Sequence, residues 1–408
     1  MNFELIIDSR PSEVVIALLR DKHLIELHKE NNDNSYSVGD IYLGKVKKVV
    51  PGLNAAFVNV GHEKDGFLHY LDLGPNVNSY KKFTEKIKAG KSNTASLKNF
   101  RKEKEIEKSG QITDVLKSGD QILIQVSKEP ISSKGPRLTT EISIAGRNMV
   151  LLPFSDKISI SNKIKSKEEK VRLKRLLKSI KPQGFGVIVR TVAEEKKVVD
   201  LDTDLKTLYK KWQGVFKELK GAQAPQEILK ELNRSSAILR DILNARFNNI
   251  YVNDKNLFLE LKDYLNSSSP EHEKILKLYK GKTSILQKFD VTKQIKASFG
   301  KTVNMKGGTY LVIEHTEAMH VIDVNSGKKV DSKKDQEENV LDVNIAAAEE
   351  VARQLRLRDM GGIIVVDFID MYDPKNRKKL HEKMQEVMKD DKAKHNILAP
   401  SKFGLVQI

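Results

Sequence analysis

The sequence predicts a multidomain chain of mixed α+β and α/β class. Short β runs separated by Gly and Pro turns fill residues 39–71 and return at 121–144. A mainly helical pattern covers residues 205–265, and strands alternate with helices from residue 309 onward. With 408 residues, 39% of them hydrophobic and 31% charged, the chain is long enough for two to four domains with sizeable cores.

The first part of the chain is predicted to be β-rich. One strand is expected at 3–7, and a hairpin at 14–19 and 24–28 turns at Arg20, Asp21 and Lys22. Further short runs suggest a small barrel of the oligonucleotide-binding type, with strands at 41–50, 55–60, 66–70, 121–126 and 138–144.

The second half is predicted to be mixed and then α/β. A further strand pair is expected before the helical region, at 186–191 and 197–201. Within that region Trp212 and Phe216 lie on an apolar stripe, which favours a core position over ligand binding. Beyond it we expect strands at 309–314, 318–324 and 363–367 and helices at 343–358 and 375–388. This alternation predicts a largely parallel sheet.

Positive charge is concentrated in two segments. The chain has 72 Lys and Arg against 55 Asp and Glu, a net charge of +17 that suggests a polyanionic partner such as nucleic acid or an anionic membrane. Residues 75–110 are rich in Lys and low in large apolar residues, which indicates a flexible insertion or a poorly packed helix. Residues 163–181 predict an amphipathic basic helix that ends before Pro182. Direct RNA contact and a solvated face are both open for these segments.

The composition also excludes several classes. The chain has no Cys, so disulfides, thiolate zinc sites and cysteine nucleophiles are excluded within these residues, and a reducing compartment is favoured. No apolar run approaches the roughly 18 residues that a membrane span needs. The first residues include acids where a signal peptide would be basic. A cytoplasmic protein is therefore expected.

Two aspartates lie where apolar strands are expected to end. Asp323 follows the run 320–322, and Asp367 follows the run 363–366. Functional groups cluster beyond the carboxyl ends of strands in α/β sheets. Two carboxylates there repel each other, and a Mg²⁺ ion would resolve the conflict. Asn325 would point to the same side and could bond a phosphate oxygen or orient a water. On spacing alone, however, a strand-end aspartate is more often a turn or helix cap.

The chain resembles the ribonuclease E/G family. The resemblance is carried by segments that occur in the family's order and cover nearly the whole chain: 41–46, 55–58, 66–68, 138–146, 186–191, 314–318, 321–327 and 353–371. It implies an endoribonuclease that cuts single-stranded RNA in rRNA, tRNA or mRNA processing. The products would carry a 5′-phosphate and a 3′-hydroxyl.

By residue match, the resemblance implies a catalytic site. Asp323 and Asp367 would hold Mg²⁺, and Asn325 would support the scissile phosphate. Phe57 and Phe67 match barrel aromatics that pack on a base. Without the match, a place in the barrel core would be favoured for Phe57.

The resemblance also implies further RNA contacts. Lys134 matches a lysine that contacts RNA. The pocket for a stimulating 5′-monophosphate end would be formed by Gly146, Val150, Arg190 and Thr191. For Arg190 alone, a salt bridge would be equally expected. Lys394 stands where family members can carry an arginine that completes this sensor, and lysine lacks the bidentate geometry.

The resemblance implies a domain order. An RNase H-like scaffold would comprise 1–35 and 236–300, an oligonucleotide-binding barrel 36–140 with the insertion 75–110, a 5′-sensor region 141–235, and a DNase I-like catalytic domain 301–408. The family continues into a two-cysteine zinc link and a small dimerisation domain. Zinc is therefore not expected in this chain, and a homodimer or higher oligomer is expected only for a longer form. The length resembles the G branch more than the E branch.

Two other functions stay open at this stage. A non-catalytic RNA-binding protein would use the barrel and the basic segments alone. A metal phosphoesterase acting on DNA or on a small phosphate ester would have no use for the barrel. Residues 301–370 carry nine Lys and Arg against thirteen Asp and Glu, so the expected catalytic segment is acidic, as a Mg²⁺ site requires.

Overall fold

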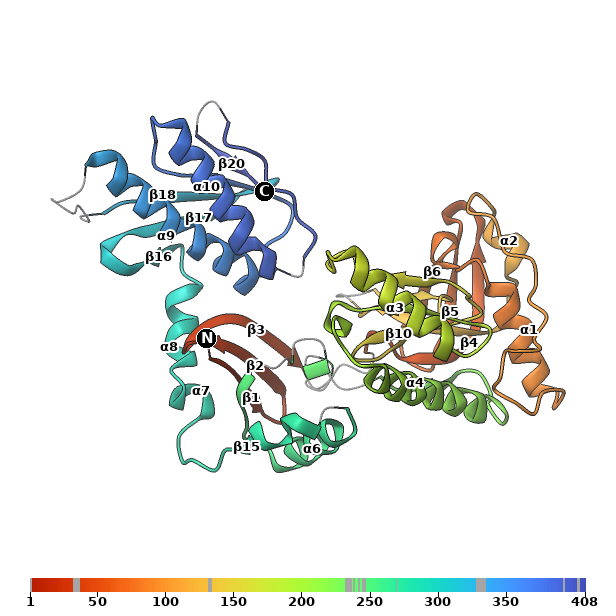
Figure 1. Ribbon diagram of the computed structural model, residues 1–408. Coiled ribbons are helices and arrows are strands. Elements are labelled where there is room, and N and C mark those ends of the chain that lie inside the picture. Colours follow the sequence, from red (N-terminus) through yellow and green to blue (C-terminus); the bar gives the residue numbers. More distant parts are fainter. Residues whose placement is uncertain are drawn as a thin grey trace. The chain divides into compact units, whose positions relative to one another are not determined.

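The chain forms two compact units in the computed structural model (Figure 1). Unit 1 comprises residues 1–32, 245–263 and 271–408, and unit 2 comprises 33–244 and 264–270. The structure describes residues 2–31, 37–130, 134–231, 237, 239, 240, 243, 247–268, 270–327, 335–391, 393–401 and 404–408. Across these ranges, no helix combines the length and the apolar character needed to cross a membrane.

Unit 1 begins with a five-stranded sheet in the order β15-β14-β1-β2-β3. Its strands are β1 (Phe3–Ser9), β2 (Glu13–Arg20), β3 (His23–Asn31), β14 (Phe247–Val252) and β15 (Leu276–Leu278). The predicted hairpin is confirmed, with Asp21 and Lys22 at φ 48° and 67°. Such a two-residue turn requires positive φ at both positions.

Strand β14 corrects the prediction of a mainly helical region. It pairs in parallel with β1, more than 240 positions earlier in the chain, and buries Ile250 and Val252. The helical pattern is borne out on either side of it, by α4 (Val198–Leu219) and α6 (Lys255–Ser268). Two shorter helices follow, α7 (Ile285–Lys288) and α8 (Val291–Ser298).

The second sheet of unit 1 holds Asp323 and Asp367. Its order is β16-β17-β18-β19-β20. The strands are β16 (Thr302–Asn304), β17 (Tyr310–His315), β18 (Met319–Asn325), β19 (Ile363–Asp367) and β20 (Val406–Gln407). Helices α9 (Gln336–Leu357) and α10 (Pro374–Val387) share one apolar core with this sheet (Figure 1).

The prediction of a largely parallel sheet is wrong. Only β18 and β19 pair in parallel, whereas β16–β17, β17–β18 and β19–β20 are antiparallel. The physical reason is the connection length. Three residues join β17 to β18, which allows only a hairpin, while α9 provides the crossover that a parallel pair needs.

Unit 2 contains the predicted barrel. Strands β4 (Ile41–Val50), β5 (Ala55–Asn59), β6 (Gly66–His69), β8 (Arg137–Thr139) and β7 (Gln121–Lys128) form a closed ring, because β7 also pairs with β4. The five-stranded barrel is therefore confirmed. A strand from the predicted sensor range, β13 (Gln226–Leu229), adds to the other edge of β4.

A second, four-stranded sheet in unit 2 has the order β11-β12-β10-β9. Its strands are β9 (Ile144–Ala145), β10 (Met149–Pro153), β11 (Ile158–Ile160) and β12 (Phe185–Val189). The run expected as one strand at 138–144 is therefore split between the barrel and this sheet. Its two ends pair with different partners, which no local pattern encodes.

The strand expected at 197–201 is wrong, because these residues begin helix α4. Asp200 accepts a hydrogen bond from the Lys197 backbone N–H at 3.2 Å, which stabilises the first helical turn. Leu201 then starts the buried stripe of α4. The β-branched residues Val198 and Val199 suggested a strand, but both are exposed in the helix.

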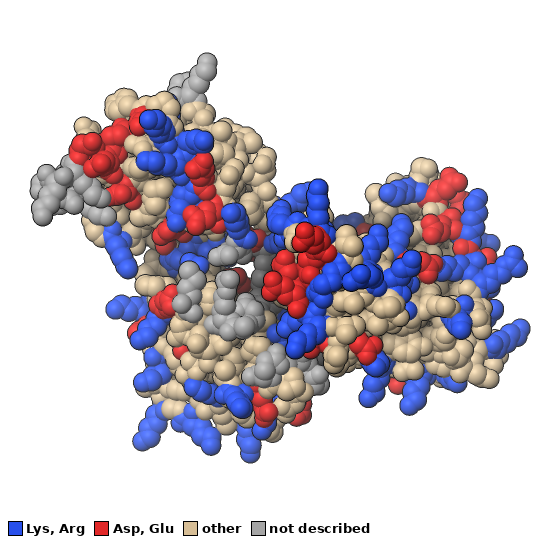
Figure 2. All heavy atoms as spheres, viewed as in Figure 1, with Lys and Arg blue, Asp and Glu red and all other residues tan. Residues whose placement is uncertain are grey.

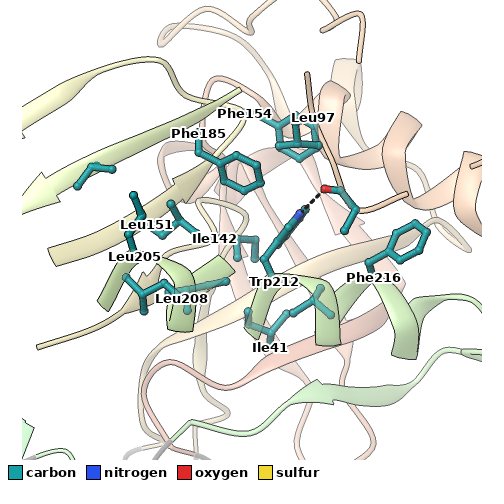
Figure 3. Close-up of a cluster of buried hydrophobic side chains, with 14 of the residues drawn as sticks. Ile41, Leu97, Ile142, Leu151, Phe154, Phe185, Leu205, Leu208, Trp212 and Phe216 are labelled. Carbon is teal, nitrogen blue, oxygen red and sulfur yellow. Dashed lines mark hydrogen bonds between the residues drawn. The ribbon is translucent and has the colours of Figure 1, made fainter. Parts of the chain in front are cut away.

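The Lys-rich segment 75–110 is well packed, which corrects its description as flexible or poorly packed. Helix α1 (Val77–Lys88) lies here, with the short α2 (Ile112–Val115) just beyond it. The Phe83 ring of α1 stacks on Trp212 of α4, with ring centroids 5.3 Å apart. Trp212 Nε1 also donates to the Ala95 carbonyl oxygen at 2.9 Å (Figure 3). Six buried hydrophobic side chains therefore lie among the lysines, namely Val77, Tyr80, Phe83, Ile87, Ala95 and Leu97.

The amphipathic basic helix is confirmed as α3 (Lys167–Ile180). Ser166 caps its start by accepting from the Glu169 N–H at 3.1 Å, and Leu173 and Leu177 are buried. Basic side chains on its other face are exposed, namely Lys174, Arg175 and Lys178. Lysine and arginine are also spread over the visible face of unit 2 in Figure 2.

Candidate active site and nucleic-acid interface

Asp323 and Asp367 are neighbours across two parallel strands. They are register partners in β18 and β19, and both are exposed. Strand alternation explains their orientation, because Ile322, Val324 and Val366 turn the other way into the core under α9 and α10. The two carboxylates therefore emerge side by side on the open face of the sheet.

Asn325 belongs to the same group. It follows Asp323 by two positions, so both side chains lie on one face of β18. Its Nδ2 donates to Asp323 Oδ2 at 2.8 Å. The amide therefore orients one carboxylate oxygen, and the three predicted catalytic residues lie together.

Asp367 has a raised pKa within this group. Partial burial raises the pKa of its carboxyl, and repulsion from Asp323 and then from Asp370 raises it further. Carboxylates that repel each other in this way favour a bound cation. Two oxygen donors with open positions for water and phosphate fit Mg²⁺, which takes one or two carboxylates. Within the described ranges, no group of three or more His, Asp or Glu residues forms a fuller cage.

The segment after β19 is tied to α9 by two side chains. The buried Asn344 donates from Nδ2 to the Ile369 carbonyl oxygen at 2.7 Å and accepts from the Ile369 N–H at 3.0 Å. Glu337 accepts from the Tyr372 and Asp373 N–H groups at 3.2 and 3.0 Å. These hydrogen bonds lower the pKa of the Glu337 carboxyl, and the one from the Asp373 N–H has the larger effect. The backbone beyond Asp367 is therefore fixed.

The barrel carries the two predicted RNA-binding aromatics on its outer face. Phe57 and Phe67 are register partners in β5 and β6, with ring centroids 5.8 Å apart. Both are only partly buried, while their neighbours Ala56 and Leu68 fill the barrel interior. The strand position of Phe57 alone favoured a place in the barrel core. The structure instead places its ring on the outer face.

Basic residues flank these rings. Lys48 pairs in register with Phe57, and Arg137 pairs with Phe67, so a row of basic and aromatic side chains crosses four strands. Arg137 also forms a two-point ion pair with Asp72, at 2.8 and 3.0 Å. Lys134 is exposed three residues before Arg137.

The four sensor residues converge at the edge of the second sheet of unit 2. Val150 lies in β10, opposite Ile188 of β12, and Arg190 and Thr191 directly follow β12. Arg190 Nη1 donates to the Gly146 carbonyl oxygen at 2.9 Å. The Thr191 hydroxyl lies 3.0 Å from the Ser161 hydroxyl.

Asp204 of α4 binds the backbone turn between Gly146 and Val150. Its carboxylate accepts from the Asn148 backbone N–H at 2.8 Å, and the Arg147 and Met149 backbone N–H groups also hydrogen bond to it. Burial raises the pKa of Asp204, and these hydrogen bonds oppose the rise. A Cβ at Gly146 would lie 2.8 Å from Asp204 Oδ1, so any larger residue there would displace the Asp204 carboxylate.

Comparison with known proteins decides the family. The sequence model of the ribonuclease E/G family matches residues 143–408. The chain belongs to the ribonuclease E/G family. It is similar to ribonuclease G of Escherichia coli strain K12, with 31% identity over 408 residues, all of this chain and 79% of that protein.

Two further relatives span both branches of the ribonuclease E/G family. Ribonuclease G of Haemophilus influenzae is 33% identical over 405 residues, which cover 99% of this chain and 78% of the relative. Ribonuclease E of Synechocystis sp. is 36% identical over 411 aligned positions, covering 98% of this chain and 56% of the relative.

The ribonuclease E/G family match covers the aspartates, Asn325 and the sensor residues. The barrel residues precede the matched range and are covered by the full-length similarity to the relatives. Lys394 is exposed and belongs to unit 1, whereas the other sensor residues belong to unit 2. Its place in the sensor stays a prediction.

Sequence reasoning missed the residues that support these sites. Asn344 and Asp204 were not singled out, although each is a polar residue within or beside an apolar helical stripe. That interruption was the available signal, because a buried polar group requires a partner. The partner itself, a loop backbone, is visible only in the folded chain.

Proposed function

We propose that this member of the ribonuclease E/G family is a Mg²⁺-dependent enzyme that cleaves single-stranded RNA and leaves 5′-phosphate and 3′-hydroxyl ends. Family membership makes the chain an endoribonuclease, and the metal and the end chemistry are the proposal. The observation that carries it is the register pair Asp323–Asp367 with Asn325 on the same sheet face.

The donor set supports magnesium at this position. Asp323 and Asp367 would hold the ion through their carboxylate oxygens. When bound, Mg²⁺ supplies Lewis-acid stabilisation for charge on the phosphate. Asn325 keeps Asp323 oriented and presents its amide to the phosphate. The fixed backbone after β19 holds Asp367 in place, so little reorganisation accompanies substrate binding.

The barrel provides a surface suited to single-stranded RNA. Phe57 and Phe67 expose ring area beside Lys48, Arg137 and Lys134. Aromatic faces stack on bases of any identity, and basic groups follow the phosphates. Paired bases in a duplex offer no free faces, so this surface favours single strands.

We further propose that a 5′-monophosphate stimulates cleavage. Arg190, Thr191 and the residues around Gly146 would receive the terminal phosphate, since guanidinium and hydroxyl groups form charge-assisted and neutral hydrogen bonds to it. Lys394 would add charge without a bidentate contact. Equal cleavage rates for 5′-monophosphate and 5′-hydroxyl RNA would remove this part of the proposal.

The wider setting is proposed from the family resemblance. The first sheet of unit 1 would be the RNase H-like scaffold, and the second sheet with α9 and α10 would be the DNase I-like catalytic domain. The enzyme would act in the cytoplasm on rRNA, tRNA or mRNA precursors. A longer form would assemble as a homodimer or higher oligomer.

Cleavage of a 5′-monophosphorylated, A/U-rich single-stranded RNA tests the catalytic proposal. We expect Mg²⁺-dependent cleavage by the intact chain, and a rate loss of roughly 100-fold or more for Asp323→Asn and for Asp367→Asn. Glu317→Gln is the matched control, because Glu317 is an exposed carboxylate in the turn between β17 and β18 and forms no ion pair with another described residue. Full cleavage by either Asp variant would overturn the metal-site assignment.

A further inference from the structure

An exposed aromatic ring lies just beyond Asp367. Tyr372 follows that aspartate by five positions and is 83% exposed. Large apolar rings are normally buried, at least in part, because water contact is unfavourable. An exposed ring five residues after a proposed catalytic carboxylate is available to contact a ligand.

The backbone that carries this ring is held by three side chains, two from α9 and one from α10. Glu337 accepts from the Tyr372 and Asp373 N–H groups, Asn344 clamps Ile369, and Arg377 Nη1 donates to the Met371 carbonyl oxygen at 2.9 Å. The ring therefore extends from a fixed loop. Preorganisation of this kind lowers the entropy lost when a ligand binds.

The ring borders a pocket. The pocket has a volume of about 350 Å³, and its lining includes the apolar side chains Phe368, Met371 and Leu380. Its polar lining includes Asp370 and Arg377. Among the described residues, no carboxylate forms an ion pair with Arg377, so its guanidinium keeps donors available beside an apolar surface.

We propose that this pocket is a nucleotide subsite next to the scissile phosphate. A nucleobase would stack on Tyr372, and Arg377 would donate to the phosphate that flanks the base. Asp370 repels phosphate and would instead accept from an amino group of the base. The subsite rests on the proposed ribonuclease function, since it would position RNA over Asp323 and Asp367.

Fluorescence of 2-aminopurine, placed at successive positions around the cleavage site of a short single-stranded RNA, tests the subsite. Ca²⁺ replaces Mg²⁺, so that the RNA binds with cleavage suppressed. Stacking on Tyr372 should quench the probe at one position in the wild type and in Tyr372→Phe. The quench should be absent in Tyr372→Ala, with the KM for cleavage raised roughly 5- to 100-fold and a smaller change in kcat.

Phe299→Ala is the matched control. Phe299 is also exposed in unit 1, at 44%, but it lines a different pocket. It should leave the quench and the KM unchanged. Unchanged quench and KM in Tyr372→Ala would overturn the subsite, as would equal losses in Tyr372→Ala and Tyr372→Phe. A wild-type chain that quenches the probe but fails to cleave with Mg²⁺ would instead overturn the proposed function.

Discussion

At the scale of single residues, repulsion between the Asp323 and Asp367 carboxylates destabilises the folded chain. Their carboxylates are register partners, and burial together with mutual repulsion raises the pKa of Asp367. Relative to the unfolded chain, the folded chain therefore holds the Asp367 proton to a higher pH. Ionisation of Asp367 lowers stability once the pH exceeds the ordinary Asp pKa of about 4. A cation that binds both carboxylates would offset this cost.

Asp367→Asn should therefore raise metal-free stability or leave it unchanged, while it lowers the cleavage rate roughly 100-fold or more. Thermal unfolding in EDTA between roughly pH 4 and 7 measures this. The wild type should lose stability as the pH rises through the ordinary Asp range, and the variant should show a flatter dependence. A variant that melts lower than Glu317→Gln at pH 7 would contradict the repulsion argument.

The loop after β19 shows how an element supports the site. Asn344 lies on the buried side of α9. Its side-chain amide donates to the Ile369 carbonyl oxygen and accepts from the Ile369 N–H. Helix α9 thereby fixes the backbone two residues beyond Asp367. The same helix provides the apolar stripe that covers the sheet, so packing and positioning come from a single element.

Asn344→Leu should lower both stability and turnover. It removes the two hydrogen bonds between the Asn344 side chain and the Ile369 backbone. Each backbone group left unsatisfied should lower the free energy of unfolding by about 1–3 kcal/mol. Cleavage should show a reduced kcat with little change in KM, because substrate contacts are intact. Ala346→Ser, an exposed change on the same helix, should have no effect. Normal turnover in Asn344→Leu would show that the clamp does not position Asp367.

Helix α1 is the second case at this scale. Phe83→Ala should destabilise unit 2 by about 3–5 kcal/mol, because it leaves a cavity beside Trp212. Urea unfolding measures the loss, and Lys104→Ala, an exposed change in the same Lys-rich segment, is the control. Equal urea midpoints for Phe83→Ala and Lys104→Ala would show that segment 75–110 is poorly packed, as its sequence suggested.

Charge and chemistry are separated at the scale of the whole molecule. The positive surplus is greatest in segments 75–110 and 163–181, both in unit 2, whereas the acidic segment 301–370 lies in unit 1. Phosphate contacts supply affinity without sequence information. Exposed basic residues of α3 therefore suit RNA attraction, while the aspartates suit metal binding.

Substituting Gln for Lys174, Arg175 and Lys178 together should weaken RNA binding and its salt dependence. Each phosphate contact to a single strand contributes about 0.7 to the slope of log affinity against log salt, so loss of three contacts should reduce the slope by about 2. Fluorescence anisotropy at several salt concentrations measures this. Gln at Lys280, Lys282 and Lys288, which are exposed in unit 1, is the matched control. Identical slopes for the two triple variants would mean that α3 is only a solvated face.

Much of the local structure was predictable because its causes are local. Alternating apolar residues and turn residues specified the barrel strands, and the apolar runs before Asp323 and Asp367 specified β18 and β19. Strand β19 ends at Asp367, whereas β18 continues two residues past Asp323 to Asn325. The family resemblance added the roles of these aspartates and of the sensor residues. Those roles could not be obtained from spacing, because a strand-end aspartate is more often a turn or helix cap than a metal ligand.

The sequence by itself determined the barrel, the basic helix α3 and the strands that carry Asp323 and Asp367, since each follows from a periodic pattern or a turn within a few residues. Only the tertiary structure decided that 197–201 is helical, that β14 pairs with β1, that α1 is packed against α4 and that Asn344 binds the backbone after β19. For β14, α1 and Asn344 the stabilising partner lies 25 or more positions away in the chain. A local pattern carries no information about such a partner, and the burial that results outweighs the local preference.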